Sequence, residues 1–210
     1  MSSDNITLIG MPGAGKSTVG IVLAKVLGYD FIDSDLLIQK SEGMLLWQII
    51  ESRGIDGFHE AEERVNAGID VSQSVIATGG SVIYGDRAMS HLKSIGKVVY
   101  LKIGCEELTQ RLGDLAKRGV TIKPGQTLGD LYAERVPLYE KYADITVNIS
   151  HIGIAEAAEK VRLQVIRETR LQRSRDPWHL PTALPERRLI SFRGSASVRH
   201  REPAACGHPP

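Results

Sequence analysis

The chain has 210 residues, of which 42% are hydrophobic and 24% charged, and this is enough apolar sequence for one domain with a buried core. The formal net charge of +1 gives no reason to expect a nucleic acid or a membrane surface as the partner of the whole chain. The opening residues, MSSDNITLIG, lack a basic segment and no window approaches the roughly 18 uninterrupted apolar residues that span a bilayer, so we expect a cytoplasmic protein.

Residues 1–172 alternate short apolar runs with segments of helical periodicity, a pattern typical of repeated strand–helix–strand units. The predicted strands cover residues 6–10, 29–33, 74–80, 97–103 and 144–149. The predicted helices cover residues 16–27, 35–53, 58–69, 86–95, 106–112, 128–143 and 154–170. The run VVYLKI is apolar except for Lys102, which favours a strand covered on both faces. We therefore predict an α/β fold, a three-layer sandwich with a five-stranded parallel sheet.

The segment from residue 173 to residue 210 differs in composition from the rest of the chain. It holds six of the nine prolines, seven arginines and three acidic residues, without sustained periodicity. This composition predicts a disordered basic tail that follows a single domain, residues 1–172. A basic arm that touches nucleic acid is the alternative, but the arginines are scattered and no stacking platform is evident. Cys105 and Cys206 match no metal-ligand spacing and are expected to be free thiols.

A glycine-rich loop, GMPGAGKST, follows the first predicted strand and opens the first predicted helix. It fits the pattern G-x-x-x-x-G-K-S, in which glycines turn backbone N–H groups toward phosphates and the helix N-terminus favours negative charge. We expect the lysine to reach the β and γ phosphates and the serine hydroxyl to ligate Mg²⁺. The predicted nucleotide-binding residues in this loop are Gly13, Ala14, Gly15, Lys16, Ser17 and Thr18. A plain strand-to-helix turn is the alternative, but the motif in this context indicates a nucleoside triphosphate site of the broad P-loop class.

Two further clusters stand at predicted strand ends, where ligands bind in open α/β sheets. Asp33 ends the second strand and Asp35 opens the following helix, so one carboxylate could serve the metal and the other an acceptor hydroxyl. Asp35 could instead only cap that helix, since Asp is a favoured N-cap. Gly79 and Gly80 allow backbone to approach a ligand closely, or form an ordinary turn.

These motifs together resemble those of shikimate kinases. The resemblance rests on the loop, D-x-D at residues 33–35, Phe58 with Glu62, TGGS at residues 78–81, VVYL, Arg111 and ERVPLYEKYAD, and it covers roughly residues 5–165. It implies ATP-dependent phosphorylation of a hydroxyl group on a small hydroxylated acid, with shikimate converted to shikimate 3-phosphate in aromatic amino acid biosynthesis. It implies ATP and Mg²⁺ as cofactors.

The resemblance also implies roles for individual residues. Ser17 and Asp33 would position Mg²⁺, Asp33 through water, and Arg111 would lie near the nucleotide. Asp35 would hydrogen-bond the acceptor hydroxyls and take the proton. The further substrate-binding positions would be His59, Gly79, Gly80, Ser81 and Arg135, with Arg135 meeting a carboxylate. Residues 113–127 would form a lid from which Lys117 or Arg118 reaches the transferring phosphoryl group, and Arg118 is our catalytic candidate there.

The departures from the family pattern all touch the acceptor side. His59 stands where the family has an arginine, and a neutral imidazole offers neither the bidentate fork nor the permanent charge. Ser81 replaces a third glycine, Ile55 replaces a glutamate, and the lid reads KRGVTIKPGQT in place of R-P-L-L. The donor-side residues are intact.

Three functions stay open on the sequence alone. The first is a shikimate kinase with an atypical acceptor pocket. The second is a kinase of the same fold acting on another small hydroxy compound, such as homoserine or a sugar acid. The third is a nucleotide-binding protein without catalytic activity. We expect a monomer that binds a small hydroxy acid, and neither nucleic acid nor membrane.

Overall fold

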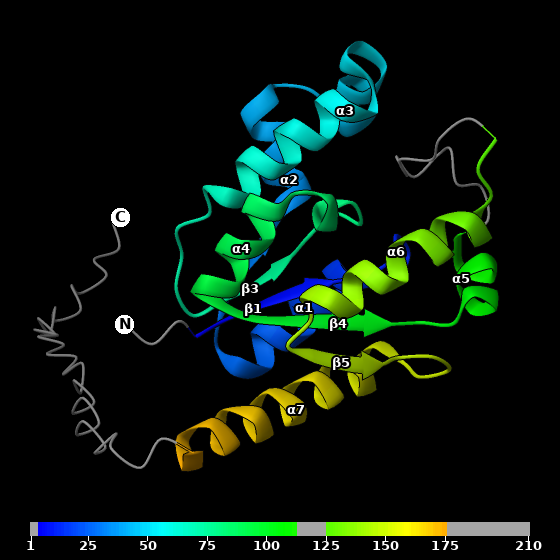
Figure 1. The fold of residues 1–210 in the computed structure, drawn as a ribbon. Helices are drawn as coiled ribbons and strands as arrows, with labels where there is room; N and C mark the ends of the chain where they lie inside the picture. The colour runs from blue at the N-terminus through cyan, green and yellow to red at the C-terminus, as the bar shows by residue number, and fades with distance from the viewer. Residues whose placement is uncertain (1–3, 113–124, 176–210) are drawn as a thin grey trace, which may run out of the picture. The chain divides into compact units, whose positions relative to one another are not determined.

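The computed structural model describes residues 4–112 and 125–175, and within them it confirms the predicted α/β sandwich (Figure 1). Five parallel strands form one sheet in the order β2-β3-β1-β4-β5. The strands are β1 (Asn5–Ile9), β2 (Asp30–Asp33), β3 (Ser74–Ala77), β4 (Gly96–Lys102) and β5 (Ile145–Asn148). Since all five strands are parallel, their carboxyl ends meet at one edge of the sheet.

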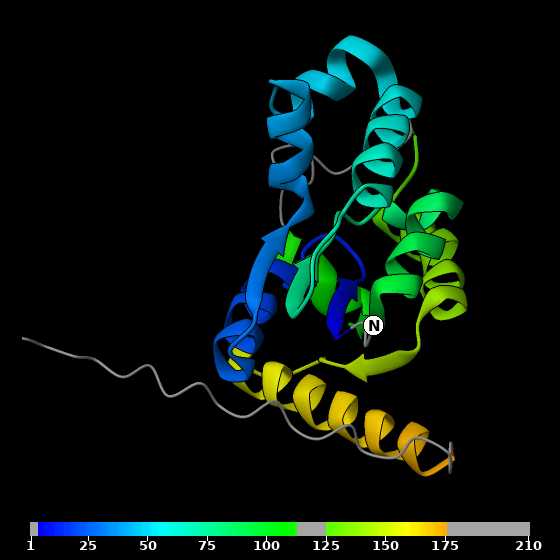
Figure 2. The same ribbon diagram turned by 90° about the vertical axis from the view of Figure 1, so that its left-hand side faces the viewer.

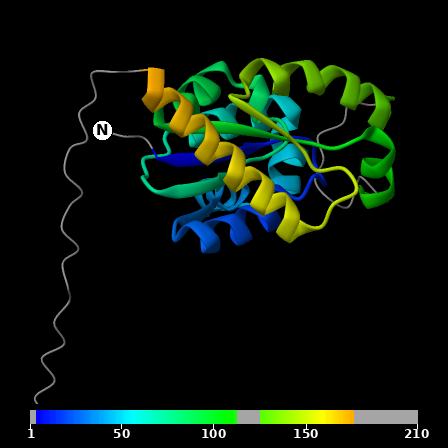
Figure 3. The ribbon, with the colours of Figure 1, turned by 90° about the horizontal axis from the view of Figure 1, so that it is seen from below.

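The helices are arranged on both faces of the sheet. They are α1 (Lys16–Leu27), α2 (Ser34–Glu42), α3 (Leu46–Ala67), α4 (Asp86–Ile95), α5 (Cys105–Leu112), α6 (Leu128–Tyr142) and α7 (Ile154–Arg175), with the 3₁₀ turn η1 (Val82–Tyr84). Figure 3 shows α7 crossing one face, and Figure 1 shows α4 and α6 on the other. In Figure 2, α2 and the adjoining half of α3 stand up from the carboxyl edge of β2.

The predicted helix over residues 35–53 is wrong in its extent. Gly43 adopts a left-handed conformation with φ 66°, which ends α2, and α3 begins at Leu46. Helix α3 then continues past Gly54, whose φ of 72° and ψ of −178° place a kink inside it, and so absorbs the helix predicted at 58–69. At the other end of the chain, α7 runs to Arg175 rather than to Arg170. Residues 176–210 of the predicted tail lie outside the described residues.

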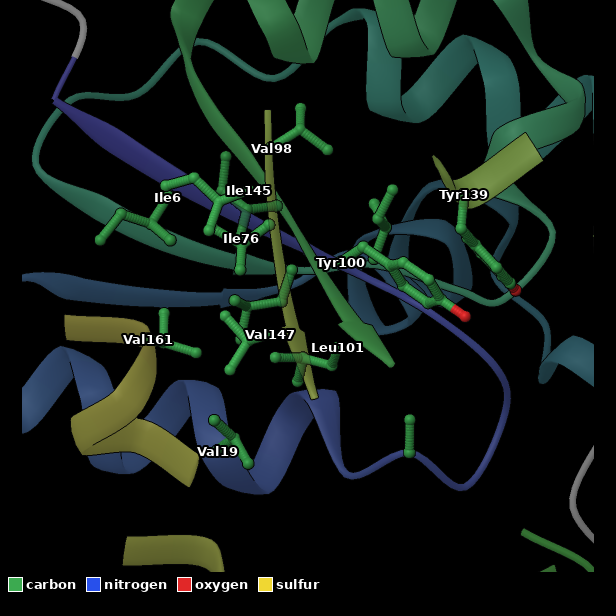
Figure 4. Close-up of a cluster of buried hydrophobic side chains, with 14 of the residues drawn as sticks. Ile6, Val19, Ile76, Val98, Tyr100, Leu101, Tyr139, Ile145, Val147 and Val161 are labelled. Atoms are coloured by element: carbon green, nitrogen blue, oxygen red, sulfur yellow. The ribbon is translucent and has the colours of Figure 1, made fainter. Parts of the chain in front are cut away.

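The core lies on both sides of the central strands. Every residue of β1 is buried, and its side chains pack with those of the neighbouring strands and of α1, α6 and α7 (Figure 4). Buried members of this cluster include Ile6, Val19, Ile76, Val98, Tyr100, Leu101, Tyr139, Ile145, Val147 and Val161. A second, smaller cluster of Ile38, Ile49 and Phe58 joins α2 to α3. This second cluster fixes the helix segment that carries His59.

Among the described residues, no helix is both long enough and apolar enough to cross a membrane.

Candidate active site

The glycine-rich loop between β1 and α1 lies at the carboxyl edge of the sheet. Gly10, Gly13 and Gly15 have positive φ values of 145°, 80° and 92°, a conformation that residues other than glycine rarely adopt. At Gly10, an added Cβ would also lie 2.7 Å from the carbonyl oxygen of Leu101. The loop therefore needs glycine for its curvature, and the curvature brings its backbone to the N-terminus of α1 as the sequence predicts.

Lys16 is the first residue of α1, its side chain reaches back into this loop, and it is only 8% exposed. Its Nζ donates hydrogen bonds to the carbonyl oxygens of Gly10, at 2.9 Å, and Met11, at 3.0 Å. Burial lowers the pKa of Lys16 to about 8, and the nearby charge of Asp35 opposes that shift. The lysine thus holds a partly desolvated positive charge at the helix N-terminus, where a phosphate group would bind favourably.

Ser17 and Asp33 meet beside the loop, as predicted. The Ser17 hydroxyl donates to Asp33 Oδ2 at 2.7 Å, and Asp33 Oδ1 accepts from the backbone N–H of Asp35 at 3.0 Å. Asp33 is therefore the N-cap of α2. The alternative role of Asp35 as the helix cap is wrong, because its neighbour already fills that position and Asp35 lies inside the first turn.

Asp35 and Glu62 place two carboxylates beside Gly79. A Cβ added to Gly79 would overlap Glu62 Oε1 and would come within 2.9 Å of Asp35 Oδ1. Burial, reinforced by the charge of Asp33, raises the pKa of Asp35, whereas Lys16 lowers it. Burial also raises the pKa of Glu62 to about 8, while a hydrogen bond from Ser81 acts in the opposite direction. Glu62 is 1% exposed, and our site prediction gave it no role.

The TGGS turn after β3 is held by hydrogen bonds at both ends. Thr78 donates from Oγ1 to the carbonyl oxygen of Leu8 at 3.0 Å, and the Tyr139 hydroxyl donates to the carbonyl oxygen of Gly80 at 2.6 Å. A Cβ on Gly80 would lie 2.8 Å from Pro12 and 3.2 Å from Arg135 Nη1. Gly80 thus passes between the phosphate loop and α6, while Gly79 passes the carboxylates of Asp35 and Glu62, which explains why neither position carries a side chain.

Arg135 and His59 border a cavity of about 190 Å³ next to this turn. Arg135 is 1% exposed, and its guanidinium lies over the Tyr84 ring, 5.3 Å from the ring centroid. The His59 and Tyr84 ring centroids are 5.0 Å apart. The other lining residues are Ile55, Asp56, Gln126, Leu131 and Glu134. The cavity thus combines one arginine and one imidazole with two acidic side chains, and our prediction had missed Tyr84 and Glu134.

A second cavity, of about 330 Å³, lies against the loop itself. It is lined by Ala14, Gly15, Thr18, Val19, Arg111, Ile149, Ile152, Gly153, Ile154 and Ala157. Arg111 Nη2 donates to Glu107 Oε1 at 2.5 Å, and Glu107 Oε2 accepts from the backbone N–H of His151 at 2.9 Å. The cavity joins the predicted residues of the glycine-rich loop to Arg111. The segment after β5, which no motif in the sequence indicated, forms its opposite wall.

The remaining predicted site residues, Lys117 and Arg118, lie outside the described residues, as does most of the predicted lid. Of residues 113–127, the structure describes only the last three. Among them, Thr127 caps α6 by accepting from the N–H of Asp130.

A family model and curated relatives both match this chain to shikimate kinases. A family model described as "Shikimate kinase" matches residues 12–166. A shikimate kinase of Clostridium botulinum (strain 657 / Type Ba4) is 40% identical over 155 residues, which are 70% of this chain and 89% of the relative. A shikimate kinase of Francisella tularensis subsp. novicida (strain U112) is 39% identical over 169 residues, or 79% and 96% of the two chains.

Solved structures agree with these relatives. The structure of shikimate kinase from Acinetobacter baumannii in complex with shikimate matches with a TM-score of 0.71 and 36% identity, covering 80% of this chain and 95% of that one. The shikimate kinase of Aquifex aeolicus vf5 matches with a TM-score of 0.68 and 32% identity, covering 79% and 98%.

Proposed function

Because the chain belongs to the shikimate kinase family and is thus an ATP-dependent small-molecule kinase, we propose that it transfers the terminal phosphoryl group of ATP to shikimate. The product is shikimate 3-phosphate, an intermediate of aromatic amino acid biosynthesis. The observation that carries the proposal is the position of Asp35, whose carboxylate lies beside Gly79 on the acceptor side and interacts with the charge of Lys16 on the donor side.

On the donor side, the loop binds the phosphates of ATP and the 330 Å³ cavity binds its adenine ring. The loop N–H groups and Lys16 hold the phosphates, with Ser17 and Thr18 at the start of α1. The apolar walls of the 330 Å³ cavity suit the faces of the adenine ring, and Arg111 adds a planar cation at its border. The hydrogen bond that Arg111 donates to Glu107 fixes the direction of that guanidinium.

Ser17 and Asp33 fit a magnesium ion. Their side-chain oxygens lie 2.7 Å apart at the phosphate loop, and Mg²⁺ prefers such oxygen ligands while it retains water and phosphate in its shell. When bound, Mg²⁺ neutralises charge on the β and γ phosphates. The capping bond to Asp35 N–H holds the Asp33 carboxylate in place for this role.

On the acceptor side, Asp35 orients the substrate hydroxyl and takes its proton. Its raised pKa brings the carboxylate closer to the range in which proton transfer is efficient near neutral pH. Gly79 and Gly80 offer backbone N–H groups to the acid next to Ser81, and Arg135 binds its carboxylate with His59 beside it. Arg118 is the proposed catalytic cation of the lid.

A kinase for another small hydroxy compound is the second candidate, because the acceptor cavity holds His59 and two acidic side chains beside its one arginine. A coupled assay for ADP release separates the two. With ATP and Mg²⁺ fixed, shikimate, homoserine and several sugar acids are compared as acceptors. We expect release that depends on shikimate. Release with another acceptor alone would establish the second candidate, and none with any acceptor despite ATP binding would favour a nucleotide-binding protein.

A further inference from the structure

Tyr84 contacts both His59 and Arg135, the two basic residues that line the acceptor cavity. It is the last residue of η1, which directly follows the TGGS turn, and its N–H donates to the carbonyl oxygen of Ser81 at 2.9 Å. The tyrosine is half-buried and lines the cavity together with His59 and Arg135. Its backbone is thus tied to the turn that we assign to the substrate.

The hydroxyl group of Tyr84 links two charged side chains of α6. It donates a hydrogen bond to Glu134 Oε1 at 2.6 Å and accepts one from Arg135 Nε at 3.2 Å. Burial raises the pKa of Tyr84, and the hydrogen bond to Glu134 adds to the effect, so the phenol keeps its proton at neutral pH. The Tyr84 hydroxyl therefore remains a hydrogen-bond donor to Glu134 at neutral pH.

The ring of Tyr84 has a separate function from its hydroxyl. The Arg135 guanidinium lies 5.3 Å from the ring centroid, a cation–π distance, and the His59 ring packs at 5.0 Å with an angle of 36° between the planes. One aromatic side chain thus limits the orientations of both basic groups. An arginine side chain has several rotatable bonds, so fixing it before substrate binds reduces the entropy that binding must overcome.

We infer that Tyr84 is a positioning residue that sets the orientation of Arg135 and His59 for the carboxylate of the acceptor. The inference rests on the proposed function, since it takes the 190 Å³ cavity to be the acceptor side. The hydroxyl acts on Arg135 through Nε, and the ring acts on both partners. Removing the hydroxyl alone should therefore weaken acceptor binding less than removing the whole ring.

The test compares Tyr84→Phe and Tyr84→Leu in the full chain. Loss of a hydrogen bond to a charged group predicts a rise of roughly tenfold in KM for shikimate in Tyr84→Phe. Tyr84→Leu should raise it further, because it also removes the cation–π contact and the ring stacking. KM for ATP should stay within about twofold in both variants, since the nucleotide cavity shares no lining residue with the acceptor cavity.

Tyr142→Phe is a matched control. The hydroxyl of Tyr142 also donates to a carboxylate, that of Asp86, but Tyr142 is the last residue of α6 and precedes β5 at the amino-terminal edge of the sheet. This variant should leave both KM values unchanged. Melting temperatures of all three variants identify any loss of folding.

The outcomes separate this inference from the proposed function. An active wild type whose Tyr84→Phe and Tyr84→Leu variants keep the wild-type KM for shikimate would overturn the positioning role alone. A parallel rise in KM for shikimate and for ATP would also overturn it, because it would indicate a general structural role. A wild type that shows no turnover of shikimate would overturn the proposed function itself.

Discussion

The donor side of the site is formed mainly by backbone groups, and the acceptor side mainly by side chains. On the donor side, backbone geometry dominates: three glycines with positive φ curve the loop, and the N-terminus of α1 faces its interior. On the acceptor side, side chains from η1, α3 and α6 meet around one cavity. Backbone N–H groups are present whichever side chain a position carries, whereas groups supplied by side chains change with each substitution. Two of the departures from the family pattern, Ile55 and His59, line that cavity.

The largest effect should come from the donor side, from Lys16→Met. This variant keeps an unbranched side chain of similar length but removes the charged ammonium group that donates to the carbonyl oxygens of Gly10 and Met11. We expect turnover to fall by roughly a thousandfold, the scale for losing one electrostatic group in a desolvated site. Steady-state kinetics with ATP and shikimate give the value, and turnover within tenfold of wild type would show that the loop backbone suffices.

Asp35→Asn tests where the two sides meet. We expect turnover to fall by at least about a hundredfold, because the amide cannot take the proton of the acceptor hydroxyl. The variant leaves the helix cap intact, since Asp33 makes the capping bond, so its melting temperature should match that of wild type. In wild type, kcat should fall as pH drops through the raised pKa of this group. Near-normal turnover would reduce Asp35 to a structural residue.

His59→Arg tests whether the imidazole limits shikimate binding on the acceptor side. A guanidinium adds permanent charge and a bidentate fork to the cavity, so KM for shikimate should fall by roughly tenfold while KM for ATP stays the same. The wild-type KM for shikimate provides the reference. A higher KM for shikimate, with gain or loss of activity on another acceptor, would identify His59 as the residue that selects a different substrate.

The smallest effect concerns stability. Glu62 has a pKa of about 8 in the folded chain against an ordinary value of 4.5, so the folded state binds the additional proton between these values. Wild-type stability should therefore decline as pH rises from about 5 to about 8. Glu62→Gln should remove this part of the decline and melt higher than wild type at pH near 8, by a few degrees. If the melting temperatures of the two proteins change with pH in the same way, the raised pKa of Glu62 is contradicted.

Much of the fold and of the donor side could be predicted from the sequence. Helices α1 and α4 have the predicted ends, and the glycine-rich loop lies between a strand and a helix as its motif requires. The break between α2 and α3 was not predicted, because the apolar pattern continues through MLLWQII and only the left-handed φ of Gly43 ends the first helix. Local pattern predicts local elements well where no single residue overrides it.

The acceptor side was predicted only in part. The resemblance gave Arg135 and His59, but the contacts of Tyr84 with Glu134 and Arg135 join residues about fifty positions apart. No local pattern carries that information, since it depends on how α6 packs against η1. Glu62 offered one signal, an acidic residue four positions after the buried Phe58 and so on the same helix face.

The most direct test of the central claim is the identification of the product. Full-length chain is incubated with ATP, Mg²⁺ and shikimate, ADP is counted, and the phosphorylated product is identified by phosphorus NMR and mass spectrometry. We predict one ADP per shikimate consumed and a single phosphate ester at the 3-hydroxyl group. ADP released without a phosphorylated shikimate, or a phosphate ester formed only on another hydroxy acid, would contradict the assignment.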